Sequence, residues 1–258
     1  MSYDRNKSWN ALRLTEGSDV IGSYSTCKAA RVEIRVAVDV AAAATDAAYW
    51  VAGKLRNAAA RRGGACFAVS GGTTPAKMFG ALSTMDVPWS SVTVWQVDER
   101  IAADGSADRN APLLDVFDAI GARVRLMPVT DRDLSAAARY YGAGLPDRFD
   151  VVHLGLGDDG HTASWTPGDS VIDELERVAL SGEYRGTRRM TLTPPVVNGA
   201  RSRVVLATGA DKAAPMRGWL LHNEALPIER LHRSGTVVVL DAAAAGLLPL
   251  AAARQQSR

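Results

Sequence analysis

The sequence predicts an α/β fold in which a mostly parallel central sheet is covered by helices on both faces. From Arg31 onward, short runs rich in β-branched residues alternate with longer runs rich in Ala, Leu, Lys and Arg, as in repeated strand–helix units. The chain has 258 residues, of which 47% are apolar and 22% charged, and no Pro/Gly/Ser-rich linker divides it. We therefore expect a single domain over residues 31–258, preceded by a polar, poorly ordered N-terminal arm over residues 1–30.

The individual elements follow from local composition. Strands are expected where Val, Ile, Thr and aromatic residues concentrate, at 32–38, 65–69, 92–97, 149–154, 190–192, 203–207 and 236–240. Helices are expected where good helix formers concentrate, at 41–62, 75–82, 134–143, 213–221 and 242–254. The alanine-rich stretches among them should serve as packing surfaces.

The overall composition excludes several classes of protein. Thirty basic against 28 acidic residues give a formal net charge of +2, which is too balanced for a nucleic-acid or membrane-binding surface. Two cysteines, Cys27 and Cys66, are too few for a disulfide framework in a chain of this size. No stretch resembles a signal peptide or is long enough to span a bilayer. We expect a cytoplasmic protein with a small-molecule partner and no nucleic-acid or membrane partner.

Three polar, glycine-containing or charged segments each follow a predicted strand directly, at 70–75 (SGGTTP), 97–100 (VDER) and 155–164 (GLGDDGHTAS). Ligands of open α/β sheets bind beyond the carboxyl ends of the strands, so we expect the three segments to surround one pocket. In the first, the diglycine permits a tight bend before a helix, and the helix start with its threonine hydroxyls suits a phosphate. The motif is not a Walker loop, and a plain strand-to-helix turn is the alternative.

The other two segments carry the ionisable groups. Arg100 would anchor phosphate or carboxylate oxygens, and Asp98 would orient a ligand hydroxyl, although both could be solvated charges at a strand end. A histidine side chain can take a proton from water near neutral pH and return it to a leaving oxygen, so His161 suits hydrolysis. A structural turn is one alternative. A metal site that adds His153 and Asp158 is another, but no recognisable ligand spacing supports it.

These residues resemble the 6-phosphogluconolactonases in SGGTTP at 70–75, DER at 98–100 and GLGDDGHTAS at 155–164, and the resemblance continues through RMTLT at 189–193, PVVN at 195–198 and TGADK at 208–212. It implies a three-layer α/β/α sandwich shared with glucosamine-6-phosphate isomerases/deaminases. It also implies hydrolysis of 6-phospho-D-glucono-1,5-lactone to 6-phosphogluconate in the oxidative pentose phosphate pathway. The implied enzyme uses neither a cofactor nor a metal and is a monomer or weak homo-oligomer.

The resemblance also implies roles for single residues. His161 is the general base, Asp159 is its supporting carboxylate, and Asp98 matches a site carboxylate of the broader superfamily. The implied substrate- and phosphate-binding residues are Gly71, Gly72, Thr73, Asp98, Arg100, Arg189 and Lys212.

Two other functions stay open at this point. The related isomerases and deaminases place Asn-Glu before a proline where this chain has Trp165 and Thr166. Proton transfer between sugar carbons needs a second acid/base group, so the missing glutamate favours hydrolysis. A non-catalytic sugar-phosphate sensor would bind the product without turning over the lactone. The chain departs from the lactonase pattern at Ala102, Ala103 and Arg109, where the preference among sugar lactones could differ.

Overall fold

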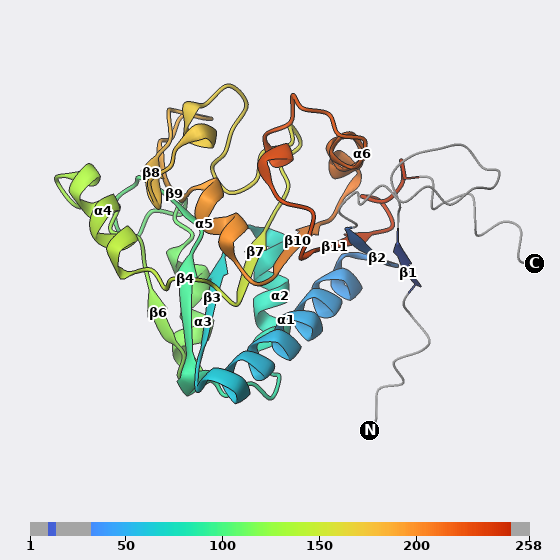
Figure 1. Cartoon of the computed structure of the whole chain (residues 1–258), viewed down its shortest axis with the longest axis horizontal. Helices are drawn as coiled ribbons and strands as arrows, with labels where there is room; N and C mark the ends of the chain where they lie inside the picture. The colour runs from blue at the N-terminus through green and yellow to red at the C-terminus, as the bar shows by residue number, and fades with distance from the viewer. Residues whose placement is uncertain (1–9, 14–31, 249–258) are drawn as a thin grey trace, which may run out of the picture.

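The computed structural model describes residues 10–13 and 32–248, which form two β-sheets with helices packed on them (Figure 1). The large sheet has eight strands, in the spatial order β1 (Asn10–Arg13), β2 (Glu33–Ala37), β11 (Thr236–Asp241), β10 (Arg203–Ala207), β7 (Val151–Leu154), β3 (Ala65–Val69), β4 (Val92–Gln96) and β6 (Arg123–Arg125). Only β1 runs antiparallel to its neighbour, β2; the other pairs in this sheet are parallel. The predicted mostly parallel central sheet is confirmed.

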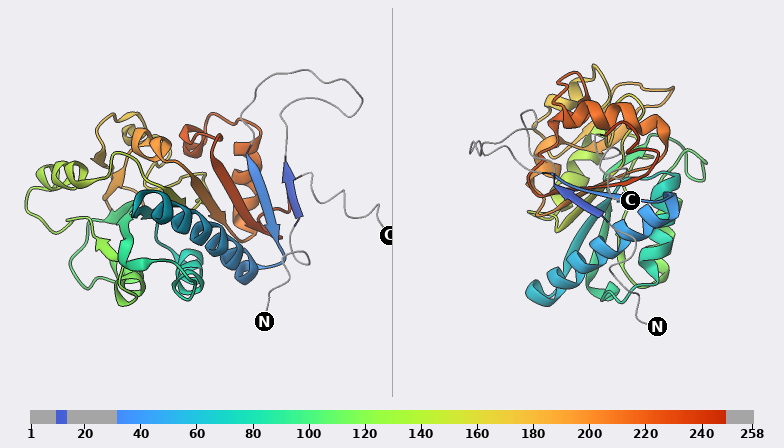
Figure 2. Two further views of the ribbon diagram at one scale, coloured as in Figure 1. Left: turned by 60° about the horizontal axis from the view of Figure 1, so that its bottom comes forward. Right: turned by 90° about the vertical axis from the view of Figure 1, so that its right-hand side faces the viewer.

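Helices lie on both faces of this sheet (Figures 1 and 2). The first face carries α1 (Val40–Arg62), α2 (Thr73–Ser83) and α3 (Asp115–Ala119), and the second carries α4 (Leu134–Gly144), α5 (Pro194–Gly199) and α6 (Ala213–Leu220). Strand alternation divides the core accordingly, because Val204 and Leu206 of β10 pack with the first set of helices while Val205 packs with the second. The α/β/α layering is therefore as expected.

A small antiparallel sheet lies on the second face, in the order β5 (Asp98–Arg100), β9 (Arg189–Leu192) and β8 (Val178–Leu180). Short 3-10 helices complete the described part of the chain, at Trp89–Ser91, Ala111–Leu114, Ser170–Asp173, Ala210–Lys212 and Pro227–Arg230. β9 of the small sheet was predicted, at 190–192, whereas β5, β8, β6, α3 and α5 were not, because each is three to six residues long and too short to show a clear hydrophobic period.

The chain crosses from the large sheet to the small one at Val97. Its N–H donates to the carbonyl of Val69 in β3 at 2.8 Å, while its carbonyl accepts from Leu192 of β9 at 2.7 Å. The interpretation of residues 98–100 as charged residues at the end of the preceding strand is therefore wrong. They form β5, whose backbone pairs with β9 instead of continuing β4.

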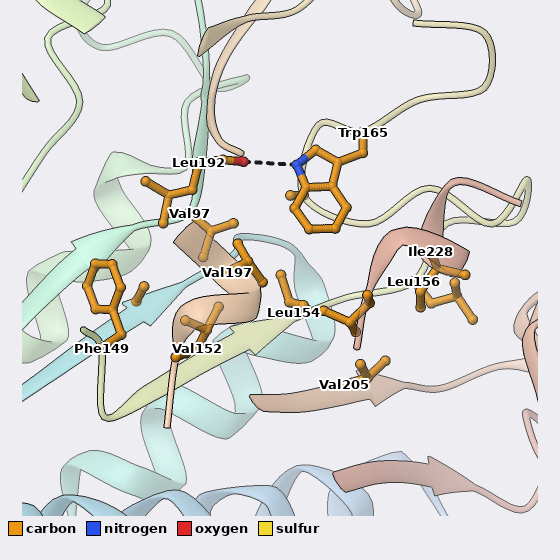
Figure 3. Packing of buried hydrophobic residues seen from close by; sticks show 14 of the residues in the cluster. Val97, Phe149, Val152, Leu154, Leu156, Trp165, Leu192, Val197, Val205 and Ile228 are labelled. Atoms are coloured by element: carbon orange, nitrogen blue, oxygen red, sulfur yellow. Dashed lines mark hydrogen bonds between the residues drawn. The ribbon is translucent and has the colours of Figure 1, made fainter. Parts of the chain in front are cut away.

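Trp165 fastens the end of the 155–164 loop to the small sheet. Its side chain is fully buried, and its indole N–H donates to the carbonyl of Leu192 at 2.9 Å (Figure 3). Leu154, at the end of β7, and Leu156, near the start of the loop, belong to the same core cluster. Buried apolar side chains thus hold both ends of the loop, and this fixes the backbone that carries the polar residues between them.

Local capping explains why the long helices were predicted closely. The Asp39 carboxylate accepts the N–H of Ala42 at the start of α1, and Gly63, with φ of 76°, ends that helix by bonding to Ala59. The helix predicted at 242–254 is wrong over its described part, because residues 242–247 form turns. Gly246 and the following Pro249 are poor helix residues, and Asp241 caps Ala244 locally.

Within the arm expected at residues 1–30, Asn10–Arg13 form β1, and the other residues lie outside the described part of the chain. Residues 249–254 of the last predicted helix lie outside it as well. None of the helices over the described residues combines the length and the apolar character needed to cross a bilayer.

Candidate active site

The three segments that follow β3, β4 and β7 meet at one edge of the large sheet, because these strands are neighbours in the order β7, β3, β4. They surround a cavity of about 490 Å³. Its walls come from all three segments, from the loop at 107–110 and from the hairpin between β8 and β9; the described residues that line it are Ser70, Gly71, Asp98, Arg100, Ala107, Asp108, Asn110, Gly155, Leu156, Gly157, His161, Thr162, Ala163, Tyr184, Arg185, Thr187 and Arg189. The size and the polar lining suit a small, charged metabolite.

His161 and Asp159 form a pair at the wall of this cavity. Nδ1 of His161 lies 2.6 Å from Oδ1 of Asp159, and the same oxygen accepts the backbone N–H of His161 at 3.1 Å. Burial alone would raise the pKa of Asp159, but hydrogen bonds from Tyr184 and from His161 outweigh it and lower the pKa to about 2. An ionised carboxylate only accepts hydrogen bonds, so Nδ1 carries the proton and the neutral ring keeps its lone pair on Nε2.

Glycines allow the loop to fold closely around this imidazole. A Cβ at Gly157 would lie 2.0 Å from Nδ1 of His161, and the N–H of Gly157 donates to the carbonyl of His161 at 2.7 Å. Gly160 has φ of 83°, in the region that favours glycine, and a Cβ there would lie 2.7 Å from Leu226. Gly157 thus leaves room for the imidazole, and Gly160 permits the turn that precedes it.

Asp98 and Arg189 form the buried, charged part of the cavity. Oδ2 of Asp98 accepts the hydroxyl of Ser164 at 2.8 Å. Burial raises the pKa of Asp98, against the lowering effects of Ser164, Arg100 and Arg189. Arg189 is 8% exposed, and its Nε has no hydrogen-bond partner among the described residues; the hydroxyl of Ser70, 5% exposed, has none among them either. Buried polar atoms are usually paired, so these two are ready to bind a polar ligand.

Arg100 is held in place by the neighbouring loop. Its Nη1 donates to the carbonyl of Asp108 at 2.9 Å and to Oδ1 of Asn110 at 2.8 Å. Asn110 also lies close to the diglycine turn, because a Cβ at Gly71 would be 2.0 Å from its Oδ1. Only glycine at position 71 therefore permits this arrangement of the arginine.

Glu99, between the cavity residues Asp98 and Arg100, holds the loop at 107–110 in place. It is fully buried, accepts the backbone N–H groups of Arg100, Asn110 and Ala111 at 2.7–2.9 Å, and forms an ion pair with Arg109. Arg109 does not line the cavity; it turns inward to Glu99. The departure from the lactonase pattern at this position is therefore a packing feature of the loop.

The remaining predicted ligand-binding residues lie around the cavity without lining it. Gly72 caps α2 with φ of 125°, and Thr73 is the first residue of that helix. Lys212 follows β10 at the same edge of the sheet, and its Nζ is 2.7 Å from the carboxylate of Asp211.

Sequence reasoning missed Tyr184, Arg185 and Asn110 as cavity residues, and it assigned no role to Ser70, which lies in the predicted segment 70–75. Tyr184 and Arg185 stand at the tip of the β8–β9 hairpin, and a turn-forming glycine at 186 was the available signal for that hairpin. Both residues contact the histidine loop, which lies about 25 positions earlier in the chain, as in the Tyr184–Asp159 hydrogen bond. No local sequence pattern predicts a contact over that separation.

The four groups of the alternative metal site do not come together. Asp158, Asp159 and His161 each have one ligand atom within 4.8 Å of the others. These side chains are already hydrogen-bonded, however: Asp159 to His161 and Tyr184, and Asp158 to Arg185. His153 is fully buried on the opposite face of β7, and burial lowers its pKa to about 3. Its ring packs edge-on against Phe79 of α2, with centroids 5.9 Å apart.

The fold and the cavity define a class of protein: a parallel α/β/α protein whose histidine–aspartate pair faces an arginine-containing pocket at the carboxyl edge of the sheet. Comparison with known proteins places the chain within that class. The sequence model for glucosamine-6-phosphate isomerases/6-phosphogluconolactonase matches residues 38–239. The chain belongs to this family, and the resemblance read from its motifs is confirmed.

Individual relatives agree with the family assignment. A 6-phosphogluconolactonase of Synechocystis sp. is 35% identical over 174 residues, which cover 62% of this chain and 72% of the relative. One of Mesorhizobium japonicum is 35% identical over 207 residues, or 75% of this chain and 84% of the relative. The crystal structure of a 6-phosphogluconolactonase from Shewanella baltica has a TM-score of 0.76 at 26% identity and covers 83% of this chain and 99% of that one.

Proposed function

We propose that this protein hydrolyses 6-phospho-D-glucono-1,5-lactone to 6-phosphogluconate, a step of the oxidative pentose phosphate pathway. The observation that carries the proposal is the pairing of Nδ1 of His161 with an ionised Asp159 at 2.6 Å, at the wall of a charged cavity. Relatives 35% identical, named 6-phosphogluconolactonase, support the choice of lactone.

The chemistry needs one base that later acts as an acid. Nε2 of His161 takes a proton from a water molecule as its oxygen attacks the lactone carbonyl, giving a tetrahedral intermediate. The intermediate collapses with cleavage of the bond between the carbonyl carbon and the ring oxygen, which receives the proton from Nε2. Asp159 remains ionised and stabilises the imidazolium. Proton transfer by such a group contributes ~10²–10⁴-fold to the rate.

The substrate carries two sites of negative charge, the phosphate and the developing oxyanion. Arg100 and Arg189, both lining the cavity, are the proposed ligands for these charges, and one well-placed oxyanion donor contributes ~10²–10³-fold. Backbone N–H groups at Gly71, Gly72 and Thr73 are proposed to assist phosphate binding. Lys212 is proposed as an outer electrostatic contact, since it stands at the same edge of the sheet.

An isomerase or deaminase activity is the runner-up, because the family includes both. Thr166 occupies the position where those enzymes are expected to carry glutamate, and it is 3% exposed beside the buried Trp165. The described residues that line the cavity include no glutamate. The cavity therefore offers no counterpart to that glutamate for moving a proton between adjacent sugar carbons, which supports hydrolysis.

The wider proposal is a cytoplasmic enzyme with a phosphorylated sugar lactone as its partner, working as a monomer or weak homo-oligomer without cofactor or metal. The near-neutral composition of the chain supports a small-molecule partner over nucleic acid.

The test is to measure acid release at constant pH from freshly prepared 6-phosphogluconolactone, corrected for spontaneous ring opening. We expect turnover by the purified, EDTA-treated chain and no ammonia from glucosamine 6-phosphate. Ammonia release would support the deaminase instead. Binding of 6-phosphogluconate without any acceleration of lactone opening would identify a sensor and refute the proposal.

A further inference from the structure

The hairpin between β8 and β9 ends in a tight turn that fixes the position of Tyr184. Tyr184 and Thr187 exchange both backbone hydrogen bonds, at 3.1 and 3.2 Å, around Arg185 and Gly186. Those two residues have φ of 52° and 77°, as in the two-residue turns whose twist matches a hairpin. The backbone of Tyr184 is thus set by a regular hairpin and not by a loose loop.

From this position Tyr184 reaches the carboxylate behind the histidine. Its hydroxyl donates to Oδ2 of Asp159 at 2.6 Å, while Oδ1 of the same carboxylate takes both hydrogen bonds from His161. Each carboxylate oxygen therefore has its own partner. The ring of Tyr184 also packs edge-on against the imidazole, with centroids 5.5 Å apart.

The charged groups around the His161–Asp159 pair come from the hairpin turn, from β9 and from the histidine loop itself. From the hairpin turn, Arg185 bonds to Asp158 at 2.7 Å, and from β9, Arg189 lies 5.3 Å from the Tyr184 ring centroid. Burial and the neighbouring Asp159 raise the pKa of Tyr184, so its hydroxyl stays protonated and acts as a donor. Of these groups, only Tyr184 and His161 are hydrogen-bonded to Asp159.

We propose that Tyr184 is a positioning residue: by holding Oδ2 of Asp159, it keeps Oδ1 on Nδ1 of His161 and so keeps Nε2 free to act as the base. The proposal rests on the hydrolytic function proposed above. A carboxylate held at one oxygen alone can rotate about its last side-chain bond, since that torsion is broad. A hydrogen bond to the other oxygen, Oδ2, from a residue on a different element removes this freedom.

The test is Tyr184→Phe, which removes only the hydroxyl and keeps the ring contact with His161. Tyr140→Phe is the matched control, because Tyr140 is 80% exposed on α4. We expect kcat to fall about tenfold, as when the outer partner of a functional histidine is lost, with KM within about twofold of the parent because bound substrate contacts are kept. We expect the acid limb of the kcat profile to move to higher pH, since a less hydrogen-bonded carboxylate favours the protonated histidine–aspartate pair.

A double-mutant cycle separates positioning from general packing. In an Asp159→Asn background, Tyr184→Phe should lower kcat no further, because the group through which it acts has already been altered. An equal, additive loss in that background would overturn the proposal, as would an unchanged kcat and pH profile in Tyr184→Phe alone.

A measurement independent of turnover keeps this inference distinct from the proposed function. The chain has only four histidines, so the ring nitrogens of His161 can be assigned by nitrogen-15 NMR with His161→Ala as the reference. We expect the Nδ1-protonated tautomer in the parent and a larger share of the Nε2-protonated tautomer in Tyr184→Phe. The same tautomer populations in the parent and in Tyr184→Phe would refute the role of Tyr184, even if the lactone is hydrolysed. The expected change in tautomer populations without lactone turnover would refute only the proposed substrate.

Discussion

The substitution Gly157→Ala moves the imidazole of His161, the proposed base, without changing any ionisable group. The added Cβ would lie 2.0 Å from Nδ1 of His161, 2.2 Å from its Cε1 and 2.7 Å from Oδ1 of Asp159. An ordinary contact is at least 3.4 Å, so the ring must move by about 1.4 Å. A displacement of about 1 Å in an active site can lower the rate ~10²-fold. We expect kcat to fall by at least this factor, because the pair with Asp159 is broken as well.

The assay is constant-pH titration of the acid released from fresh lactone, with kcat and KM determined separately. Gly53→Ala is the matched control, since a Cβ there meets nothing within 4 Å and Gly53 lies inside α1. The control should keep full activity and gain slightly in stability from the better helix propensity of alanine. If Gly157→Ala folds and turns over lactone at the parent rate, then the position of this imidazole is not critical and the geometric reasoning is refuted.

Three further substitutions test other parts of the site. Arg100→Ala should raise KM at least tenfold with a smaller change in kcat, because phosphate binding is common to ground and transition states; an unchanged KM would remove Arg100 as an anchor. Asp98→Asn should increase the free energy of unfolding relative to the parent more at pH 7 than at pH 4, as followed by urea denaturation. Burial raises the pKa of Asp98. The protonated carboxyl therefore contributes its full stabilisation below the pKa of the unfolded state, ~3.9, and this stabilisation is lost as the pH rises through the pKa of the folded state. An equal difference in unfolding free energy between Asp98→Asn and the parent at both pH values would count against a raised pKa. Glu99→Gln should destabilise the fold by about 3 kcal/mol, since it leaves Arg109 without its buried partner, and a melting temperature equal to the parent's would show that the pair is not needed.

The sequence predicted the parts of the fold that are specified locally. α1 was placed to within one residue from its run of good helix formers, and the structure adds that Asp39 and Gly63 cap its two ends. The central parallel strands β3, β4, β7, β10 and β11 were found because they are largely buried, which gives runs rich in β-branched residues, whereas the mostly exposed β6 was missed. The convergence of the three site segments followed from the same logic, since each comes directly after a strand of one sheet.

The sequence could not predict contacts that depend on distant pairing. Asp98–Arg100 was taken as a strand end because nothing local shows that its partner is β9, some ninety residues later. The hydrogen bond from Tyr184 to Asp159 depends on where the β8–β9 hairpin docks. The helix predicted at 242–254 shows the opposite error. High alanine content favoured a helix, but Gly246, Pro249 and the capping by Asp241 stabilise turns over the described residues.

The family assignment limits the candidate reactions to those of the isomerases and lactonases, and the geometry of the site indicates which residues to test first. Departures from the lactonase pattern at Arg109 prove to be structural, because that side chain pairs with Glu99 away from the cavity. Tyr184 and Arg185 line the cavity from outside the motifs shared with the lactonases, as do Ala107, Asp108, Asn110 and Thr187.

The most direct measurement is kcat of His161→Ala on fresh 6-phosphogluconolactone, with the fold verified by circular dichroism and by retained binding of 6-phosphogluconate. The proposed mechanism predicts a loss of ~10²–10⁴-fold while the product still binds. A folded His161→Ala enzyme that hydrolyses the lactone within about twofold of the parent rate would contradict the assignment of this histidine as the base.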